Sequence, residues 1–405
     1  MITLFKMAIR DLGRNRRRTF FSALALGMGL ALLLLMASVI QGEINGSMET
    51  EIKLQSGHLQ VRAITYDETK TSLKWEDLVE NPDRVAAQIS SLAPVKLATP
   101  RLFATGIVTA GEDSVGVRII GVDPTSPAND PFRNGMVSGD FLTTDDRSGI
   151  LIGEPLAKKL SLKPGDAINL LVNTANGSVD QQNFTVQGIF STHTPIYDEG
   201  TVFLPIAKAQ AITQAQNHAS TIFVLLNDKN QADAVAGALK SDKFQTIPWQ
   251  KANEILLTTE KLFNAYMVVL YMIVLAITAT VIVNTLIMSV FERTREIGIL
   301  AAIGLKGWRI MVMFFMESSL LGIGGIILGW ILGGLLVYYG TVHGFYIGNM
   351  GVSGFTLGDT IFAQWTLKNT ITLSITAFIV TLLAGLYPAI LAARMEPVEA
   401  LHAAK

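Results

Sequence analysis

Four long stretches almost free of charged residues constrain this chain more than any other feature. They cover residues 20–40, 262–291, 310–342 and 369–391, and Glu317 in the third is the one acidic or basic residue among them. About 20 apolar residues cross the hydrocarbon core of a bilayer as a helix. A buried helix of a soluble protein rarely stays without a polar face over that length. The pattern therefore predicts a membrane protein with four transmembrane helices.

The first stretch has the position of a signal peptide but differs from one in two ways. The basic region before it and its apolar run are both long, and no clean small-x-small cleavage site follows it. We interpret it as a retained helix.

The distribution of charge predicts the orientation. Residues 1–18, the short loop after the second stretch and the tail after the fourth together carry 12 basic and 5 acidic residues. Residues 42–261 and 343–368 carry 20 basic and 27 acidic residues. Because basic residues in short flanking segments stay inside, both termini and the short loop should be cytoplasmic. The insert of about 220 residues should lie outside, in the periplasm or beyond the bacterial inner membrane.

These observations give a domain plan for the whole chain. Residues 1–18 place apolar residues at helical spacing between basic ones, which predicts an amphipathic helix on the inner leaflet. The predicted order is an amphipathic cytoplasmic helix at 1–18, transmembrane helices at 19–41, 263–290, 309–342 and 369–391, an extracytoplasmic domain with stalk helices at 42–262, a short cytoplasmic helix at 291–308, an outer loop at 343–368 and a cytoplasmic tail at 392–405.

The large insert has the pattern of an α+β domain. Runs of β-branched and aromatic residues between Gly, Pro and Asp predict strands at 57–63, 95–110, 115–122, 149–153, 167–172, 183–190, 201–204, 221–226 and 244–247. Helices are predicted at 82–91, 155–160, 206–212 and 231–240. The two ends of the insert, 57–104 and 221–247, have the same strand–helix–strand order, so one subdomain should be split around a β-rich insert at about 105–215. Apolar residues near helical spacing at 42–55 and 249–262 predict stalk helices that continue from the first and second spans.

Few residues in the chain indicate a catalytic, metal-binding or phosphate-binding site. The five histidines are scattered without metal-ligand spacing, and no nucleophile elbow or phosphate-binding G-x-x-x-x-G-K-[ST] loop occurs. We therefore expect no catalytic residue and no metal site. The glycines at 322, 324, 325, 329, 333 and 334 are more typical of close helix packing than of binding. Glu317 needs a partner inside the membrane, for which Arg293, Arg309 or an adjacent subunit are candidates, and its role is either structural or in coupling to a cytoplasmic partner.

The segment after the second span is the most informative. Residues 292–304 read E-R-T-R-E-I-G-I-L-A-A-I-G, which predicts a short helix with Ile297, Leu300, Ala301 and Gly304 on one face and charges in its first turn. This segment resembles the cytoplasmic segment of the FtsX/MacB-type ABC transporter permease superfamily. The same resemblance extends to the N-terminal run at 8–19, to 149–153, 163–166, 184–189 and 202–205 in the insert, and to the C-terminal runs at 387–389, 392–394 and 396–401. Residues 56–61 are most similar to the LolC/LolE lipoprotein-releasing branch.

The resemblance implies a fold and a function. The fold would be an α-helical membrane protein with four transmembrane helices and a large α+β extracytoplasmic domain with a MacB-type core between helices 1 and 2. The chain would be a non-catalytic permease subunit that pairs with a second copy or a paralogue and with a cytoplasmic ABC ATPase dimer, which would bind the ATP and Mg. ATP hydrolysis would move the outer domain, an action termed mechanotransmission. The cargo would be lipoprotein or lipid taken from the outer leaflet, with a periplasmic carrier as acceptor; membrane lipids are contacted and no nucleic acid is expected.

Alternatives remain open at this point. A MacB-like exporter would move peptides, drugs or toxins with a periplasmic adaptor. An FtsX-like regulator would activate a cell-wall hydrolase and move no cargo. A membrane sensor has less support, because the longest inner segment is about 18 residues.

The resemblance also suggests two groups of site residues. Those expected to contact the ATPase subunit are Arg293, Arg295, Glu296, Gly298, Leu300 and Gly304. Those expected to contact the cargo, between the first and second spans near the outer leaflet, are Met36, Ile40, Phe263, Tyr266, Met267 and Leu270.

Overall fold

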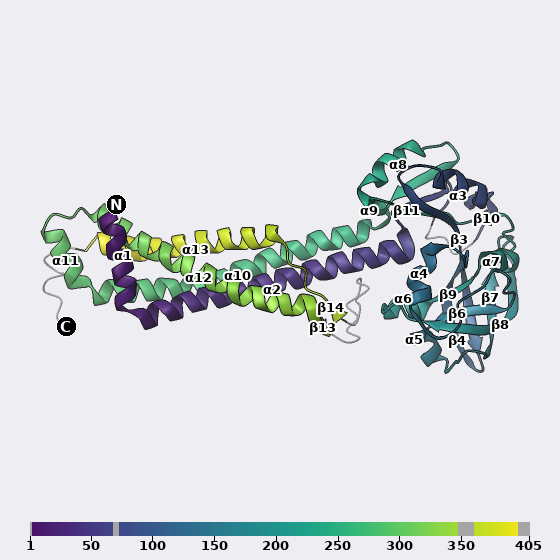
Figure 1. Ribbon diagram of the computed structural model, residues 1–405, viewed down its shortest axis with the longest axis horizontal. Coiled ribbons are helices and arrows are strands. Elements are labelled where there is room, and N and C mark those ends of the chain that lie inside the picture. Colours follow the sequence, from purple (N-terminus) through teal and green to yellow (C-terminus); the bar gives the residue numbers. More distant parts are fainter. Residues whose placement is uncertain (1, 68–72, 347–359, 396–405) are drawn as a thin grey trace. The chain divides into compact units, whose positions relative to one another are not determined.

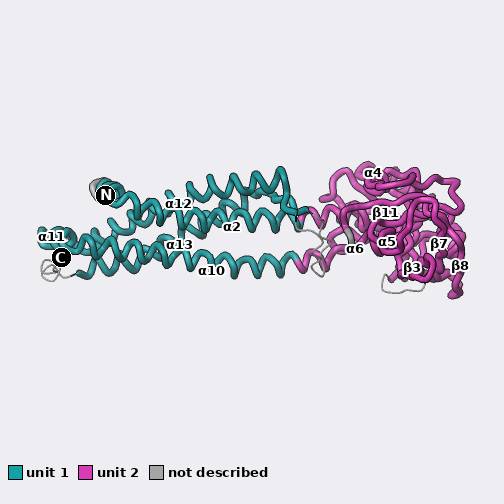
Figure 2. Tube along the Cα trace, turned by 90° about the horizontal axis from the view of Figure 1, so that it is seen from below, with its two compact units in different colours: residues 1–44, 260–346, 360–405 teal, residues 45–259, 347–359 magenta. Residues whose placement is uncertain are grey.

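A computed structural model describes residues 2–67, 73–346 and 360–395 (Figure 1). The chain divides into two compact units (Figure 2). Unit 1 comprises residues 1–44, 260–346 and 360–405, and unit 2 comprises residues 45–259 and 347–359. Residues 347–359 of the predicted outer loop and 396–405 of the predicted tail, including the C-terminal run at 396–401, lie outside the described residues.

Long helices build unit 1. Their bounds are α1 (Ile2–Arg14), α2 (Arg16–Glu51), α10 (Glu254–Glu292), α11 (Thr294–Ala302), α12 (Gly307–His343) and α13 (Leu367–Ala393). Four of them, α2, α10, α12 and α13, are long and apolar enough to cross a bilayer. Between α12 and α13, the short strands β13 (Phe345–Tyr346) and β14 (Thr360–Ile361) pair with each other.

Three of these helices are much longer than a bilayer core requires. α2 has 36 residues and continues into a π-helical turn, η1 (Ile52–Ser56), α10 has 39 residues and α12 has 37. Since a span needs about 20 residues, the remainder of α2 and α10 extends beyond the apolar stretch. Helix was predicted at 42–55 and 249–262, and the second range is divided in the structure. α9 (Trp249–Ala252) ends at Asn253, whose backbone is not helical, before α10 begins.

Glycines of α12 allow it to pack closely against α2. A Cβ added to Gly325 would lie 2.5 Å from Leu26 Cδ2, and one added to Gly329 would lie 2.9 Å from Leu30 Cβ. A Cβ on Gly333 would lie 3.1 Å from the backbone of Ala31. Small residues at every fourth position let the two helix backbones approach each other closely. Inside a membrane such contacts are stabilised by van der Waals packing, because the hydrophobic effect does not drive helices together there. The predicted packing role of the glycines is therefore confirmed at these three positions, whereas nothing lies within 4 Å of Gly334.

Unit 2 is built around a ten-stranded sheet in the order β12-β1-β11-β3-β4-β9-β6-β8-β5, with β7 pairing β3 and β8. The strands are β1 (Leu59–Ala63), β3 (Val95–Ala110), β4 (Asp113–Val122), β5 (Met136–Gly139), β6 (Gly149–Gly153), β7 (Ala167–Asn173), β8 (Val179–Phe190), β9 (Thr201–Pro205), β11 (Thr221–Leu226) and β12 (Phe244–Pro248). A separate pair joins β2 (Val79–Glu80) to β10 (His218–Ala219). The helices are α3 (Pro82–Ser90), α4 (Asp130–Asn134), α5 (Glu154–Lys159), α6 (Pro195–Gly200), α7 (Ile206–Ile212), α8 (Ala232–Ala238) and α9.

The long strand β3 connects two of the hydrophobic cores of unit 2. Its first part pairs with β11 as far as Arg101, and its second part pairs with β4 from Leu102 onward. One core contains Leu59, Val61, Ile89 and Ile222, and the other contains Leu102, Val108, Ile150 and Phe184. The change of partner lies close to residue 105, where the β-rich insert was expected to begin.

Most predicted elements of the insert are present. The strands at 95–110, 149–153 and 221–226 and the helix at 206–212 have the predicted bounds. The strand predicted at 57–63 begins at Leu59, because Gly57 has a φ of +62° and ends the preceding helical turn. The elements β2, β5, β10, α4 and α6 were not predicted, since all are too short to show a period in the sequence.

Candidate functional site

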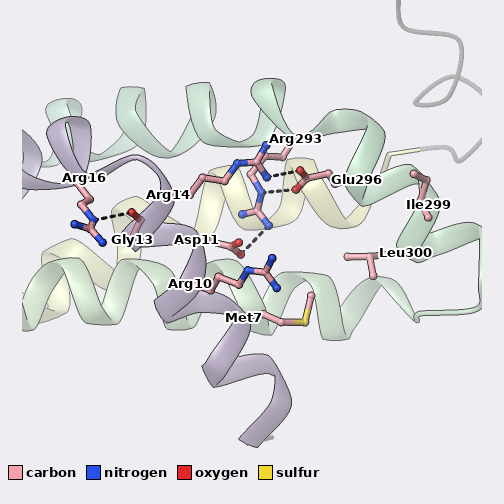
Figure 3. A pocket seen from close by; sticks show the side chains of 10 residues that line it. All are labelled: Met7, Arg10, Asp11, Gly13, Arg14, Arg16, Arg293, Glu296, Ile299 and Leu300. Atoms are coloured by element: carbon pink, nitrogen blue, oxygen red, sulfur yellow. Dashed lines mark hydrogen bonds and ion pairs between the residues drawn. The ribbon is translucent and has the colours of Figure 1, made fainter.

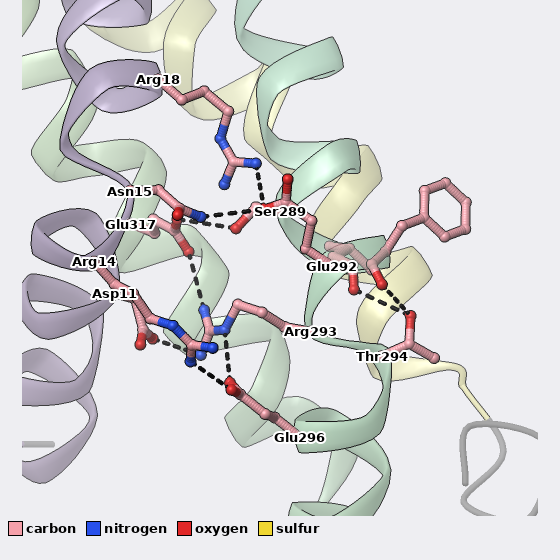
Figure 4. Close-up of polar contacts among 12 residues, drawn as sticks. Asp11, Arg14, Asn15, Arg18, Ser289, Glu292, Arg293, Thr294, Glu296 and Glu317 are labelled. Carbon is pink, nitrogen blue, oxygen red and sulfur yellow. Dashed lines mark hydrogen bonds and ion pairs between the residues drawn. The ribbon is translucent and has the colours of Figure 1, made fainter. Parts of the chain in front are cut away.

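Charged side chains from several helices of unit 1 meet around Arg293 (Figure 4). Arg293 occupies the corner between α10 and α11, where its backbone leaves the helical region (φ −115°, ψ 15°). This corner directs its side chain toward α1 and α12 (Figure 4). The groups that gather here are Asp11 and Arg14 of α1, Asn15 and Arg18 at the start of α2, Ser289 and Glu292 of α10, Glu296 of α11 and Glu317 of α12.

Arg293 is buried and touches three carboxylates. Its side chain is 8% exposed, and Nη2 lies 2.7 Å from Oδ2 of Asp11. Nε donates to Oε2 of Glu296 at 3.1 Å, and Nη1 lies 3.9 Å from Oε2 of Glu317. A buried cation is tolerated only when opposite charges and hydrogen bonds compensate its lost hydration. The arginine therefore holds α1, α11 and α12 to one point.

More exposed ion pairs surround this centre. Arg14 Nη1 lies 2.5 Å from Oε1 of Glu296, and Arg18 Nη1 lies 2.6 Å from Oε2 of Glu292. Asn15 donates to the same oxygen of Glu292 at 3.1 Å. Exposed pairs add little stability, but these connect the turn between α1 and α2 with the corner between α10 and α11.

The pKa values of Asp11 and Glu296, whose carboxylates lie outside the spans, are shifted in opposite directions. Burial raises the pKa of Asp11, and the nearby Arg293 guanidinium opposes that effect only in part. The hydrogen bond from Arg14 lowers the pKa of Glu296, with a smaller contribution from Arg293. Glu296 therefore stays ionised more readily than Asp11.

A cavity of about 840 Å³ opens beside this cluster (Figure 3). Its lining residues are Met7, Arg10, Asp11, Gly13, Arg14, Arg16, Arg293, Glu296, Ile299 and Leu300. They come from α1, the first residue of α2, the corner at Arg293 and α11. The site therefore combines salt-bridged charges with a hollow between two short helices.

The residues predicted to contact an ATPase are distributed over different faces. Arg295 and Gly304 are exposed, Glu296 and Leu300 are half-buried, and Gly298 and Arg293 are buried. The charge of Arg293 points into the cluster because Asp11 holds it there. The contact role of these six residues stays a prediction.

The short helix differs from its predicted bounds and faces. It was expected at 291–308, but α11 ends at Ala302, and Gly304 lies after it with a φ of +95°. A glycine in this conformation is a common helix stop. The buried face is anchored by Ile297, whereas Ile299 (47%) and Ile303 (75%) are exposed apolar side chains that the sequence reasoning did not select.

Glu317 finds its partner within the chain. Of the candidates left open by the sequence, the structure places Arg293 beside it, and Ser289 donates to its Oε1 at 3.4 Å. Arg309 is exposed and lies over the ring of Trp308 instead.

A second cavity, of about 440 Å³, lies among α2, α10 and α13. Of the six predicted cargo contacts, Ile40 and Met267 line it. Tyr266 (68% exposed) and Leu270 face outward from α10, and Met36 and Phe263 are half-buried outside the lining. The other lining residues are Ala37, Gln41, Glu260, Asn264, Val268, Tyr271, Met272, Leu275, Thr366, Lys368, Asn369, Thr372, Leu373 and Thr376.

Sequence reasoning did not assign a site role to Asp11, Arg14 or Glu292. Asp11 carried a signal, since it is the one acidic residue among six basic ones in residues 1–18. Its partner could not be identified from the sequence, because the contact joins distant parts of the chain.

The fold and this cluster define a multi-pass membrane protein with four candidate spanning helices and a large α+β domain inserted after the first. Comparison with known families agrees with this class. Residues 19–242 match the model of the MacB-like periplasmic core domain, and residues 268–397 match the FtsX-like permease C-terminal model. The chain therefore belongs to the MacB/FtsX-type family of ABC transporter permeases, as the sequence motifs predicted.

Individual relatives cover nearly the whole chain. The lipoprotein-releasing system transmembrane protein LolE of Haemophilus influenzae is 23% identical over 94% of this chain and 93% of its own length. LolC of Neisseria meningitidis serogroup B is 22% identical over 95% and 94%. The macrolide export ATP-binding/permease protein MacB of Chlorobium luteolum is 25% identical over 99% of this chain, which spans 60% of that protein.

Among solved structures, the periplasmic region of MacB from Actinobacillus actinomycetemcomitans is 15% identical to this chain. The match covers 50% of this chain and 96% of that structure, with a TM-score of 0.34.

Proposed function

We propose that this permease extracts lipoproteins or lipids from the outer leaflet of the bacterial inner membrane. The observation that carries the proposal is the cavity among α2, α10 and α13. Val268, Leu275 and Leu373 give it apolar walls, and Glu260 and Lys368 add charged groups to its lining. A cavity with apolar walls and charged groups fits an amphiphile, whose acyl chains would lie against the apolar wall and whose head group would lie near the charges. The similarity to LolC and LolE over almost their whole length supports this class of cargo.

The energy would come from a separate cytoplasmic ATPase dimer that binds ATP and Mg. The chain itself has no G-x-x-x-x-G-K-[ST] phosphate-binding loop. The excess of basic residues in 1–18 and in the loop that contains α11 supports a cytoplasmic position for both. The ATPase would contact the exposed face of α11, which carries Arg295, Ile299 and Ile303. Apolar side chains beside a charge are the usual composition of a protein contact.

The cluster around Arg293 would pass movement from α11 to the rest of unit 1. An ATPase that displaces α11 also displaces the corner at Arg293. Because this residue bonds to Asp11 and lies beside Glu317, α1 and α12 follow. In this mechanism the permease transmits movement from the ATPase to its outer domain, and the cargo does not cross the inner membrane.

A second copy or a paralogue of the chain would complete the transporter. The exposed apolar side chains of α10, among them Val269, Ile273 and Ile277, require either lipid or another helix. Of the four candidate spans, α10 has the smallest buried share.

Mass spectrometry of the complex, purified in mild detergent from its native membrane, tests this proposal. An ATPase subunit together with acylated lipoproteins is the expected result. An ATPase with a periplasmic adaptor and no lipoprotein would instead favour a MacB-like exporter, a class supported by the similarity of 99% of this chain to 60% of MacB. An ATPase with a cell-wall hydrolase would replace it with a regulator, and the absence of any ATPase would overturn the transporter assignment.

A further inference from the structure

Arg101 is a fully buried arginine without a carboxylate partner among the described residues of unit 2. Its side chain is 1% exposed, and it lies on β3. The guanidinium stacks on the ring of Phe223, with Cζ 3.8 Å from the ring centroid. Its Nη1 donates to the carbonyl oxygen of Leu54 at 2.6 Å, and its Nη2 lies 3.5 Å from that of Ala128. Burial lowers the pKa of this arginine to about 10, so it remains charged at neutral pH.

Arg101 faces the partial negative charge at the end of a helix. Leu54 belongs to the π-helical turn η1, which directly continues α2. The last carbonyl groups of a helix lack partners within the helix and carry partial negative charge. Arg101 Nη1 donates to one of them, the carbonyl oxygen of Leu54, so the buried cation lies beside a partial negative charge.

The same arginine lies where the sheet of unit 2 changes partner. Arg101 is the last residue of β3 paired with β11, opposite Thr221. Leu102 is the first residue paired with β4, opposite Gly121. The side chain of Arg101 therefore reaches the helix end from the boundary between the two hydrophobic cores.

Two other contacts fix the same helix end. Arg118 of β4 donates to the side-chain oxygen of Gln55 at 3.0 Å. Asn253, the residue before α10, donates to the hydroxyl of Ser56 at 3.0 Å. The end of α2–η1 and the beginning of α10 are therefore joined to each other as well as to the sheet.

We propose that Arg101 is a positioning residue for transport, which fixes the end of α2–η1 to both parts of the unit 2 sheet so that they move as one body with the helix. The role of Arg101 in transport rests on the proposed function. The contacts that Arg101, Arg118 and Asn253 make with the end of α2–η1, which we call the joint, lie within unit 2 and can be tested without ATPase or cargo.

The substitution Arg101→Met distinguishes a positioning role from a contribution to stability, because the two are measured separately. Met has similar length and fills the space against Phe223, but the buried carbonyl of Leu54 loses its donor. The variant Arg101→Met is thus expected to stay folded with an unfolding midpoint below that of the unaltered chain. Without the donor to Leu54, however, the helix end is no longer fixed.

The absence of cysteine from the chain makes distance measurement straightforward. In the full-length protein in nanodiscs, spin labels are placed on cysteines introduced at two exposed pairs of sites. The pair at Lys53 and Glu112 connects the end of α2–η1 to the turn between β3 and β4. The pair at Glu112 and Lys163 connects that turn to the turn before β7, within the part of unit 2 beyond Arg101. Pulsed electron paramagnetic resonance then gives the distribution of each distance.

The expected result of Arg101→Met is a broader distribution across the joint and an unchanged one within the sheet. The control is Arg133→Met, which also removes an arginine that donates to a carbonyl, that of Pro124, and lies over a ring, that of Phe141; Arg133 differs from Arg101 in being more exposed and in pairing with the carboxylate of Asp130. It should change neither distance. If the methionine variant does not fold, Arg101→Leu, which also lacks a donor for the carbonyl of Leu54, replaces it in the same measurement.

Two outcomes overturn the proposal. An unchanged distance across the joint shows that Arg101 does not fix the helix end. Broadening of both distances shows that Arg101 supports the fold as a whole. A narrow distance across the joint in a protein that co-purifies with no ATPase would count against the proposed function alone, so the two failures are distinguishable.

Discussion

The guanidinium of Arg293 lies 2.7 Å from the carboxylate of Asp11 and joins the corner between α10 and α11 to helix α1. Both side chains are largely buried, so neither charge is well solvated if the other is removed. The N-terminal helix is therefore ion-paired to the corner before α11, and in the proposed function it would follow the movement of α11.

Asp11→Asn should weaken this connection. The asparagine can accept one hydrogen bond but no longer neutralises Arg293, so the free energy of unfolding of unit 1 should fall by about 1–3 kcal/mol, as for hydrogen bonds to charged groups. Thermal unfolding in detergent measures the loss, and ATPase activity of the complex measures coupling. Lys6→Gln, an exposed change on the same helix, should alter neither. Equal behaviour of the two variants would contradict a role for Asp11.

Glu296→Lys should lower the ATPase activity that depends on the permease without unfolding the protein. The substitution places a lysine between Arg14 and Arg293, both of which bond to Glu296 in the structure. Arg14→Glu in the same chain restores opposite charges at the exposed pair and should recover part of the coupling. A double-mutant cycle on the purified complex measures this interaction. Coupling unaffected by the single change would remove Glu296 from the contact surface.

Gly325→Ala should separate α12 from α2. The new Cβ would lie 2.5 Å from a carbon of the buried Leu26, and overpacking of this kind costs about 1–3 kcal/mol. Gly334→Ala adds the same methyl to the same helix where nothing lies within 4 Å, so the higher helix propensity of alanine should leave it neutral or slightly stabilising. Thermal unfolding of the two variants in one detergent compares them. The packing argument fails if both behave alike.

The sequence predicted elements that depend on local patterns, and it did not predict contacts between residues far apart in the chain. The 16-residue strand β3 and helix α7 were predicted with correct bounds because apolar alternation and turn residues are local signals. Two-residue strands such as β2 carry no such signal. The cluster around Arg293 was only partly predictable: Glu317 was recognised as needing a partner, but the contribution of Asp11 required the fold. The burial of Arg101 in a predicted strand was missed for the same reason, since its partner is a carbonyl of a distant helix.

The stability of unit 2 should depend on pH through Asp198. This carboxyl is 1% exposed, and burial raises its pKa although Thr192 and Ser191 donate hydrogen bonds to it. Its pKa in the unfolded chain is near the usual value of about 3.9. Because the folded pKa is higher, the folded state binds the proton more tightly. The corresponding stability is present below the unfolded pKa and is lost as pH rises through the folded pKa.

Asp198→Asn should remove this part of the pH dependence, since the amide stays neutral and can still accept from the backbone N–H of Thr192. Chemical unfolding of the protein across the acid range, followed by tryptophan fluorescence, measures the slope. The exposed change Asp145→Asn is the control and should keep the slope of the unaltered chain. Stability should therefore rise more, or fall less, with increasing pH in Asp198→Asn than in the unaltered chain, and the opposite difference would show that the sign assigned to this group is wrong.

Met267→Trp should fill the cavity among α2, α10 and α13 and exclude an acyl chain. Met267 lines this cavity beside Ile40, whereas its neighbour Tyr266 is 68% exposed and points away from it. Tyr266→Trp therefore introduces the same indole one residue away on the same helix without entering the cavity. Native mass spectrometry of the purified complexes should show loss of acylated species from Met267→Trp and retention in Tyr266→Trp. Retention in both would place the cargo elsewhere, and loss in both would favour the outward face of α10 as the contact surface. Because the two changes share chemistry, helix and depth, the difference between them reports on the cavity and not on a general effect of added bulk.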